Sequence, residues 1–286
     1  SRKGMAKIDY NINKSHRLSV RFNYLKSFRD VTSSNSGVVS GNRSGNLFAL
    51  NFQNSNYVIN NDLYSGIVEV NSIIGTKFSN NLQFGYTANR DYRSSRGGIF
   101  PLVDILKDGT TYTTFGYEPF TPNNVLNTDT WQFKDDLTWY KGQHTLTAGI
   151  NFESFKFSNG FTPTYYGQYV YSSLDDFYKS ANGDADVTAR RYVLTYSALP
   201  NKAIPLAITR AYQPGVYIQD EVNAFGDKVK FTFGIRADMP LFGKTALNNP
   251  EVAGFTFKDA ENQPLKLNTS KMPDPKVLFS PRFGFN

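Results

Sequence analysis

Residues 229–238 read Val-Lys-Phe-Thr-Phe-Gly-Ile-Arg-Ala-Asp, and apolar and polar residues alternate through the whole stretch. Successive side chains of a β-strand point to opposite faces of its sheet. One face would carry Val229, Phe231, Phe233, Ile235 and Ala237. The other would carry Lys230, Thr232, Gly234, Arg236 and Asp238. The pattern predicts a strand with one apolar and one polar face.

The same alternation recurs along the chain. It is regular in four more stretches, at residues 6–12, 18–24, 82–88 and 146–153. Less regular strands fit Tyr64–Ile74, Asp129–Tyr140, Val216–Asn223 and Val277–Phe285. The sequence therefore predicts nine strands.

The links between these strands fall into two length classes. Short links cover residues 13–16, 75–80, 141–143 and 224–228, and long links cover approximately 27–63, 89–128, 159–213 and 240–276. Soluble β-sandwiches seldom carry four structureless loops of this size. Short turns at one end and long loops at the other are typical of outer-membrane barrels, whose long loops lie outside the cell. We expect an all-β fold, an antiparallel transmembrane β-barrel.

The composition excludes several other classes of protein. Aromatic residues make up 15% of the 286 residues and charged residues 19%, below the roughly 25% of an average soluble domain. No apolar stretch reaches the length of about 18 residues that a transmembrane helix needs. The chain has no cysteine and two histidines, His16 and His144, so we expect neither a metal site nor a cofactor.

Both ends of the chain are strand-like, and nine is an odd number of strands. Single-chain bacterial barrels usually have an even number. We therefore expect residues 1–286 to be one incomplete barrel domain, with open edges at residues 3–12 and 277–286. Unpaired edges of this length are not stable in lipid, so the remainder of the same polypeptide would pair with them.

Two tryptophans have the spacing expected of membrane-interface residues. Trp131 and Trp139 share a face and lie eight residues apart, about 26 Å along a strand. They would mark the two interfaces of the apolar band. Asp135 and Asp220 fall on the same apolar faces, where a carboxylate is costly. Either a β-bulge shifts the face at each aspartate, or both lie close to the short-turn interface.

The polar faces of the strands would line the lumen of the barrel. Across the short turn at 224–228, we expect Glu221 and Gln219 to face Lys230, with Arg236 as a further partner. The lumen candidates are Arg17, Arg21, Asn23, Glu69, Asn71, Gln83, Lys134, Asn151, Glu153, Gln219, Glu221, Lys230 and Arg236.

Four segments resemble the barrel of TonB-dependent outer-membrane receptors and transporters. Residues 217–222, Tyr-Ile-Gln-Asp-Glu-Val, followed after a short turn by residues 231–238, resemble a strand pair of that family, although Val222 replaces the usual Trp and Ala237 the usual Tyr. Residues 136–146 resemble a hairpin of the family. Residues 173–177 and 279–285 are similar to segments of its Oar-like subgroup in Bacteroidota.

The resemblance implies a 22-stranded barrel, of which this chain is a segment, plugged by a separate globular domain. It further implies energy-coupled import of a large solute across the outer membrane of a Gram-negative bacterium. The partners would be TonB, the plug and remaining strands of the same polypeptide, and outer-membrane lipid and lipopolysaccharide.

Three other functions were weighed. A surface adhesin or protein-complex component built on a barrel is the main alternative, because the long loops are equally suited to binding a surface protein. We do not expect an enzyme, because both histidines sit at short turns, away from where barrel hydrolases place their sites. The net charge of +7 comes without a nucleic-acid-binding motif, so we expect no nucleic-acid partner.

Overall fold

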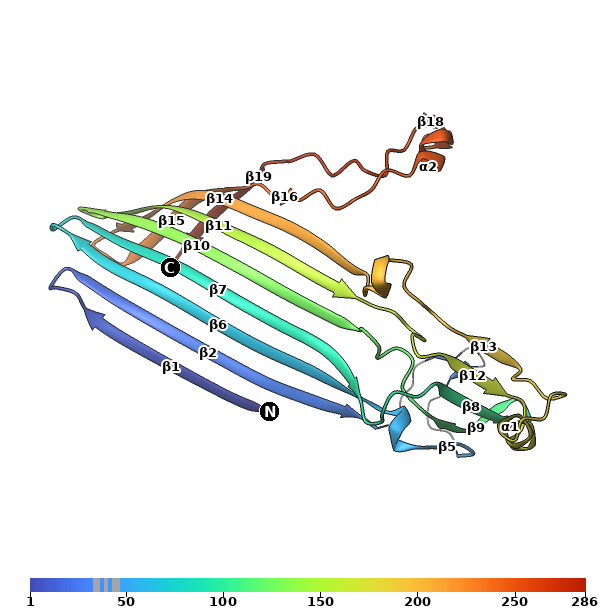
Figure 1. The fold of residues 1–286 in the computed structure, drawn as a ribbon. Coiled ribbons are helices and arrows are strands. Elements are labelled where there is room, and N and C mark those ends of the chain that lie inside the picture. Colours follow the sequence, from blue (N-terminus) through green and yellow to red (C-terminus); the bar gives the residue numbers. More distant parts are fainter. Residues whose placement is uncertain (33–36, 39–40, 43–46) are drawn as a thin grey trace.

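The computed structural model describes residues 1–32, 37–38, 41–42 and 47–286. Its main element is one antiparallel sheet in which nine strands lie side by side in chain order (Figure 1). They are β1 (Arg2–Asn11), β2 (His16–Val31), β6 (Tyr57–Ile74), β7 (Phe78–Ser95), β10 (Val125–Lys141), β11 (His144–Gly160), β14 (Leu206–Ala224), β15 (Val229–Asp238) and β19 (Leu278–Phe285). The predicted all-β, antiparallel architecture is confirmed. The sheet stays open, because β1 and β19 do not pair with each other.

Most of these strands are longer than the alternation predicted. β6 and β7 each have 18 residues and β14 has 19, whereas about 9–11 residues cross a bilayer. The extra residues lie on the long-link side. Residues 206–213 were expected in a long loop. They instead extend β14 and pair with residues 153–160 of β11. Beyond the bilayer a strand needs its backbone ladder but no apolar face, so its sequence no longer alternates.

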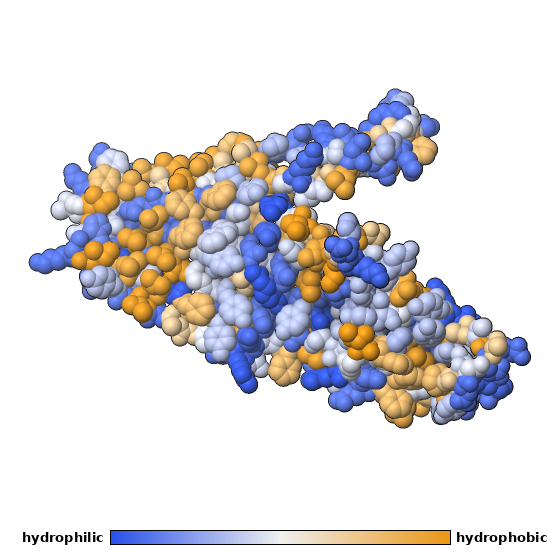
Figure 2. All heavy atoms as spheres, viewed as in Figure 1, coloured by the Kyte–Doolittle hydropathy of each residue, from blue (hydrophilic) through white to orange (hydrophobic). Residues whose placement is uncertain are grey.

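The apolar face of the sheet is uncovered. Phe84 and Phe233 keep 50% and 49% of their surface exposed, and in the part of the chain that the structure describes no second sheet packs against them. This contradicts a sandwich, in which such side chains would be buried. Figure 2 shows apolar residues gathered over the short-turn end of the sheet, with a hydrophilic band between them and the long-link end. None of the helices that the structure describes is long and apolar enough to cross a membrane.

Three of the long links fold together into a second unit, which we call the cap. Its five-stranded sheet has the order β13-β12-β8-β9-β5, with strands β5 (Leu50–Asn51), β8 (Leu102–Lys107), β9 (Thr110–Phe115), β12 (Gln168–Tyr171) and β13 (Arg191–Val193). β12 pairs with β8 in parallel, and β5 pairs with β9 in parallel. The expectation that these links are structureless loops was therefore wrong.

The cap holds the buried core of the molecule. Val103, Ile105 and Tyr171 pack together, with Phe177 against them. The 3-10 helices η1 (Gln53–Ser55) and η2 (Pro200–Lys202) lie in the same links. The side chain of Ser173 caps helix α1 (Leu174–Ala181) by accepting a hydrogen bond from the backbone N–H of Asp176 at 3.0 Å. Burial raises the pKa of the Tyr169 hydroxyl above its usual value, because the phenolate would lose hydration.

The fourth long link does not join the cap. It begins with β16 (Leu241–Phe242), which pairs with β14 beyond the end of β15. It then continues as an arm, residues 243–277, with α2 (Pro250–Gly254), β17 (Phe257–Lys258) and β18 (Pro264–Leu265). In Figure 1 this arm extends beyond the same end of the sheet as the cap and lies apart from it. Two more short strands, β3 (Gly37–Val38) and β4 (Gly41–Asn42), pair with each other in the first long link.

Candidate functional site: the polar face of the sheet

The polar face carries hydrogen-bonded networks that run from strand to strand. On β6 and β7, the carboxylate of Glu69 accepts hydrogen bonds from the side-chain amides of Asn71 and Asn81, both at 2.8 Å. Gln83 donates to Asn81 at 2.9 Å. On the next two strands, β10 and β11, the side-chain amide of Gln132 donates a hydrogen bond to the carboxylate of Glu153 at 2.8 Å. The strand register places these groups on one surface, where each carboxylate has amide donors.

At the β1 edge, the polar face of β2 contributes basic groups. Arg17 forms an ion pair with Asp9 at 3.0 Å, and Lys7 contacts the same carboxylate at 3.2 Å. Arg21 lies opposite Lys7, and Asn23 lies two residues further along β2 on the same face. These positions agree with the alternation from which the candidates were chosen. Their role as lumen residues stays a prediction.

The middle of the sheet holds a row of three residues centred on a glycine. Asp136, Gly149 and Tyr217 lie directly opposite one another on β10, β11 and β14. The Tyr217 ring lies across Gly149, and its hydroxyl donates to Asp136. A Cβ on residue 149 would come within 2.5 Å of both partners. Lys134 completes the group with an ion pair to Asp136 at 2.5 Å.

Arg236 joins this row from β15. Its guanidinium donates to Asp238 and to Asn151, each at 2.7 Å, and lies 5.8 Å from the centre of the Tyr217 ring. The expected contact between Arg236 and Glu221 is wrong, because Asp238 and Asn151 are nearer along its own face. The expected pair of Lys230 with Glu221 is confirmed, with 3.1 Å between the two charged groups.

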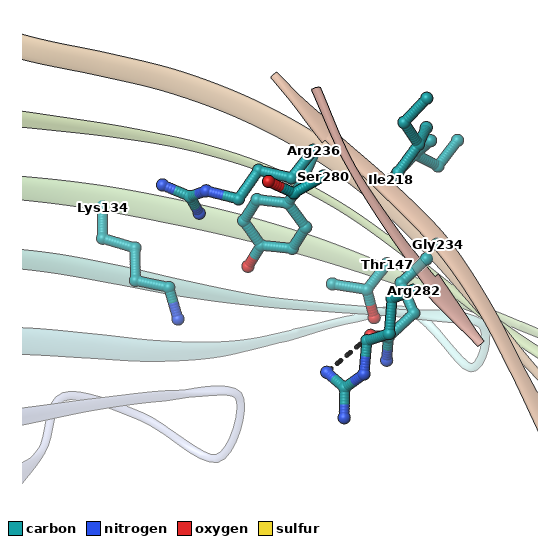
Figure 3. A pocket seen from close by; sticks show the side chains of 10 residues that line it. Lys134, Thr147, Ile218, Gly234, Arg236, Ser280 and Arg282 are labelled. Atoms are coloured by element: carbon teal, nitrogen blue, oxygen red, sulfur yellow. Dashed lines mark hydrogen bonds between the residues drawn. The ribbon is translucent and has the colours of Figure 1, made fainter. Parts of the chain in front are cut away.

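Three basic side chains converge on a hollow of about 450 Å³ on this face. Lys134, Arg236 and Arg282 reach toward it from β10, β15 and β19, while Ile218 lies on the other side of the ribbon (Figure 3). Arg282 donates to Gln219 at 3.0 Å, and among the described residues it forms no ion pair. The hollow is therefore electropositive and suits a carboxylate, a phosphate or an acidic protein surface.

Sequence reasoning missed four members of this group: Asp136, Tyr217, Asp238 and Arg282. The signal was present for three of them, because Asp136, Tyr217 and Asp238 have the parity of Lys134, Gln219 and Arg236 on their own strands. β19 alternates weakly and holds no lumen candidate, so only its register with β15, which pairs Arg282 with Gly234, places Arg282 on the polar face.

The two tryptophans lie on the opposite, apolar face. Trp131 packs on Tyr86 at 4.4 Å between ring centres, and Trp139 stacks on Phe78 at 6.2 Å. Trp139 is next to the short turn of the hairpin and Trp131 is towards the cap. Their positions at the two membrane interfaces stay a prediction.

Asp135 and Asp220 lie on this apolar face without a β-bulge. The register of β10 and β14 with their neighbours is unbroken at both residues. The bulge alternative is therefore wrong. Asn80 donates to Asp135 at 2.5 Å, and His144 contacts Asp220 at 2.7 Å. Both partners come from the strand ends next to the short turns. The position of the two aspartates at the short-turn interface stays a prediction.

The two histidines lie at short turns and have different partners, Ser72 for His16 and Asp220 for His144. Nδ1 of His16 lies 2.8 Å from the hydroxyl of Ser72, which is buried. Within the described ranges, His16 has no carboxylate that would orient it as the base of a hydrolase triad. In the same part of the chain, no three His, Cys, Asp or Glu side chains gather as metal ligands.

A comparison with known protein families agrees with this architecture. The model of the family described as "Outer membrane beta barrel domain" matches residues 1–286. Among solved structures, the chain is similar to the open form of the ferric-catecholate import receptor Fiu from E. coli K12, at 12% identity and a TM-score of 0.47. That match covers 99% of this chain and 42% of the receptor, so the chain spans less than half of the receptor's length. No curated protein matches the sequence.

Proposed function

We propose, from the premise that this chain belongs to the outer membrane beta barrel domain family, that it is the barrel segment of a TonB-dependent transporter. Membership of the family places the chain in the outer membrane, in contact with its lipid. The proposed activity is energy-coupled import of a solute too large for porins. The four sequence segments that resemble TonB-dependent receptors support this assignment, and two of them support the Oar-like subgroup.

The observation that carries the proposal is that the main sheet is still open after nine strands. Nine strands form one continuous curved sheet, and its first and last strands do not meet. An eight-stranded barrel has an interior that side chains fill, whereas barrels of 22 strands enclose a plugged lumen. A sheet that is still open after nine strands closes into a barrel of more than nine strands, which excludes the eight-stranded class and is compatible with the 22-stranded barrel proposed here. A wide lumen has room for a plug and for a large solute.

The polar face supplies the surface that such a lumen requires. Lys134, Arg236 and Arg282 surround one hollow, and Asp136 and Asp238 hold two of them in place. In the proposal this electropositive patch contacts an acidic surface of the plug or an anionic solute. Its networks keep the side chains ordered, so the contact surface exists before the partner binds.

Binding to TonB tests the energy coupling. The full-length protein that contains this chain would be extracted from outer membranes and mixed with the isolated periplasmic domain of TonB. We expect capture by that domain, and we expect an excess of a TonB-box peptide to abolish it. Failure to bind, with a correctly folded barrel, would contradict the proposal.

The cap favours a second candidate, a surface adhesin or protein-complex component. Three links are joined in one small sheet, and Tyr178, Tyr192 and Tyr196 are 56%, 50% and 77% exposed on or beside it. Exposed tyrosines on a rigid support are common in protein-binding surfaces. Cells in which Tyr192 and Tyr196 are changed to Ser would lose adhesion under this alternative, with TonB capture unchanged. We propose no catalytic role for the chain.

A further inference from the structure

The turn between β10 and β11 carries a polar cluster on the face that contacts lipid. Lys141 and His144 lie directly opposite each other at the turn. One step further from the turn, Trp139, Leu146 and Asp220 form a row across β10, β11 and β14 on the same face. Two basic groups are thus placed at the edge of the apolar band, above an apolar floor.

The contacts within this cluster hold the two basic groups in place. Nζ of Lys141 lies 4.9 Å from the centre of the Trp139 ring. Nδ1 of His144 lies 2.7 Å from Oδ2 of Asp220. An ionised carboxylate only accepts hydrogen bonds, so Nδ1 is the donor, and the Nε2 end of the ring is left for another partner. The other oxygen of Asp220, Oδ1, is buried and has no hydrogen-bond partner among the described residues.

These residues line a shallow hollow of about 550 Å³. Its wall consists of Trp139, Leu146 and the turn backbone, and its rim consists of Lys141 and His144. The lining thus places two basic side chains, Lys141 and His144, beside the carboxylate of Asp220 and an apolar surface. This arrangement suits an anionic ligand that has an apolar body.

We propose that this hollow binds the phosphodiester headgroup of a glycerophospholipid in the periplasmic leaflet. Short turns of outer-membrane barrels lie on the periplasmic side, so the hollow opens into that leaflet. Lys141 would donate to the phosphate, and Nε2 of His144 would donate to it in the imidazolium form, in which both ring nitrogens carry a hydrogen. The acyl chains would lie on Trp139 and Leu146. Asp220 is a positioning residue, because it orients the imidazole. The inference depends on the outer-membrane location and is independent of TonB-dependent transport.

The shared chemistry is a phosphodiester, which is present in a lipid and in the free headgroup. The test uses phosphatidylglycerol that carries a photoactivatable diazirine next to its glycerol, in vesicles containing the full-length protein. After irradiation and chymotryptic digestion, label is measured on fragments 141–146 and 226–231. The second fragment comes from the neighbouring β14–β15 turn and serves as an internal control. An arm with excess glycerophosphoglycerol, which has no acyl chains, separates lipid from free headgroup.

We expect label on fragment 141–146 to exceed that on fragment 226–231. A single basic residue near a membrane surface changes attraction to an anionic lipid about fivefold, so Lys141→Gln should lower the label by about that factor. His144→Gln should lower the label on fragment 141–146 more than Lys141→Gln does, whereas Lys141→Arg should retain the label. Lys228→Gln, which removes the same charge at the neighbouring turn, should leave it unchanged.

Three results would overturn the proposal. Equal labelling of the two fragments would mean that the lipid is bulk lipid. Unchanged labelling in Lys141→Gln would mean that the rim charges bind nothing. Loss of label on addition of glycerophosphoglycerol would assign the hollow to a soluble phosphodiester. Resistance of each variant to trypsin in vesicles, compared with the unmodified protein, shows whether the barrel has folded.

Discussion

A single glycine on the polar face makes room for Tyr217. Because the Tyr217 ring lies over Gly149 and reaches Asp136, a methyl group at residue 149 has to displace the ring. We expect Gly149→Ala to lower the free energy of unfolding by about 1–3 kcal/mol. Urea titration of the full-length protein in vesicles measures this. The matched control is Gly85→Ala on the same polar face, where a Cβ would make only ordinary contacts at 3.5–3.7 Å, and an equal loss there would contradict the packing argument.

The two faces of β7 provide a second comparison at the scale of one residue. Phe84 lies between Val68 and Phe133 on the apolar face, and Gln83 lies between Glu69 and Lys134 on the polar face. Phe84→Arg should cost about 2–4 kcal/mol if it lies near the midplane of the bilayer. Gln83→Arg should cost far less, because its face is hydrated and Glu69 is adjacent. A folding titration in which Gln83→Arg is the more damaging change would shift the assignment of faces by one residue.

Phe233 on β15 also lies on the apolar face, but it is less suitable than Phe84 for a substitution by arginine. It lies opposite Asp220 on the apolar face, so an arginine introduced there would have a carboxylate partner. The strand register shows that Phe233 and Asp220 are opposite each other, whereas the alternation along a single strand does not.

At the scale of the element, alternation predicted the strands where lipid and water impose opposite demands on the two faces. It identified the nine strands that pair in chain order in the main sheet, since a one-residue slip would expose polar groups to lipid, and it missed the short tenth strand β16. It did not predict residues 206–213 of β14, because both faces are hydrated there. It also did not predict the cap, whose sheet forms from strands in three separate links. Pairings such as β12 with β8 join residues that are distant in sequence and leave no local periodicity.

In the cap, Asp104 connects two of the long links that form its sheet. This buried carboxylate on β8 accepts from Thr114 at 2.6 Å on β9 and from Gln168 at 2.8 Å on β12. Asp104→Ala removes the acceptor from both buried donors, at about 1–3 kcal/mol for each unsatisfied group. We expect amides of β12 to exchange hydrogen faster while amides of β10 and β11 keep their protection. Lys107→Ala, an exposed change on the same strand, should leave exchange in the cap unaltered. Loss of protection in β10 as well would mean that cap and barrel unfold together.

At the scale of the whole molecule, the two ends of the sheet should differ in access from outside the cell. The arm carries Lys258, Lys266 and Lys271 in exposed positions, on the same side as the cap. Trypsin added to intact cells should cut the arm and leave Lys141 and Lys228 at the short turns intact. Permeabilised cells are the control, because cleavage at the short turns is then expected. Cleavage at Lys141 in intact cells would invert the topology.

The last prediction concerns the two open edges of the sheet. Ile8 on β1 and Phe283 on β19 are exposed on the apolar face at 69% and 65%, so both edge strands lie at the level of the lipid. Each unpaired backbone group in lipid costs several kcal/mol, and each edge strand presents a row of them. We therefore expect further strands of the same polypeptide to pair with both edges. Residues 1–286 produced alone and mixed with vesicles should give no protease-resistant species whose gel mobility changes on heating, whereas the full-length protein should give one. A stable species from residues 1–286 with the mass of two copies would instead mean that β1 of one copy pairs with β19 of the next. Closure by the remainder of the polypeptide would then be wrong, and the lumen would be that of an 18-stranded ring.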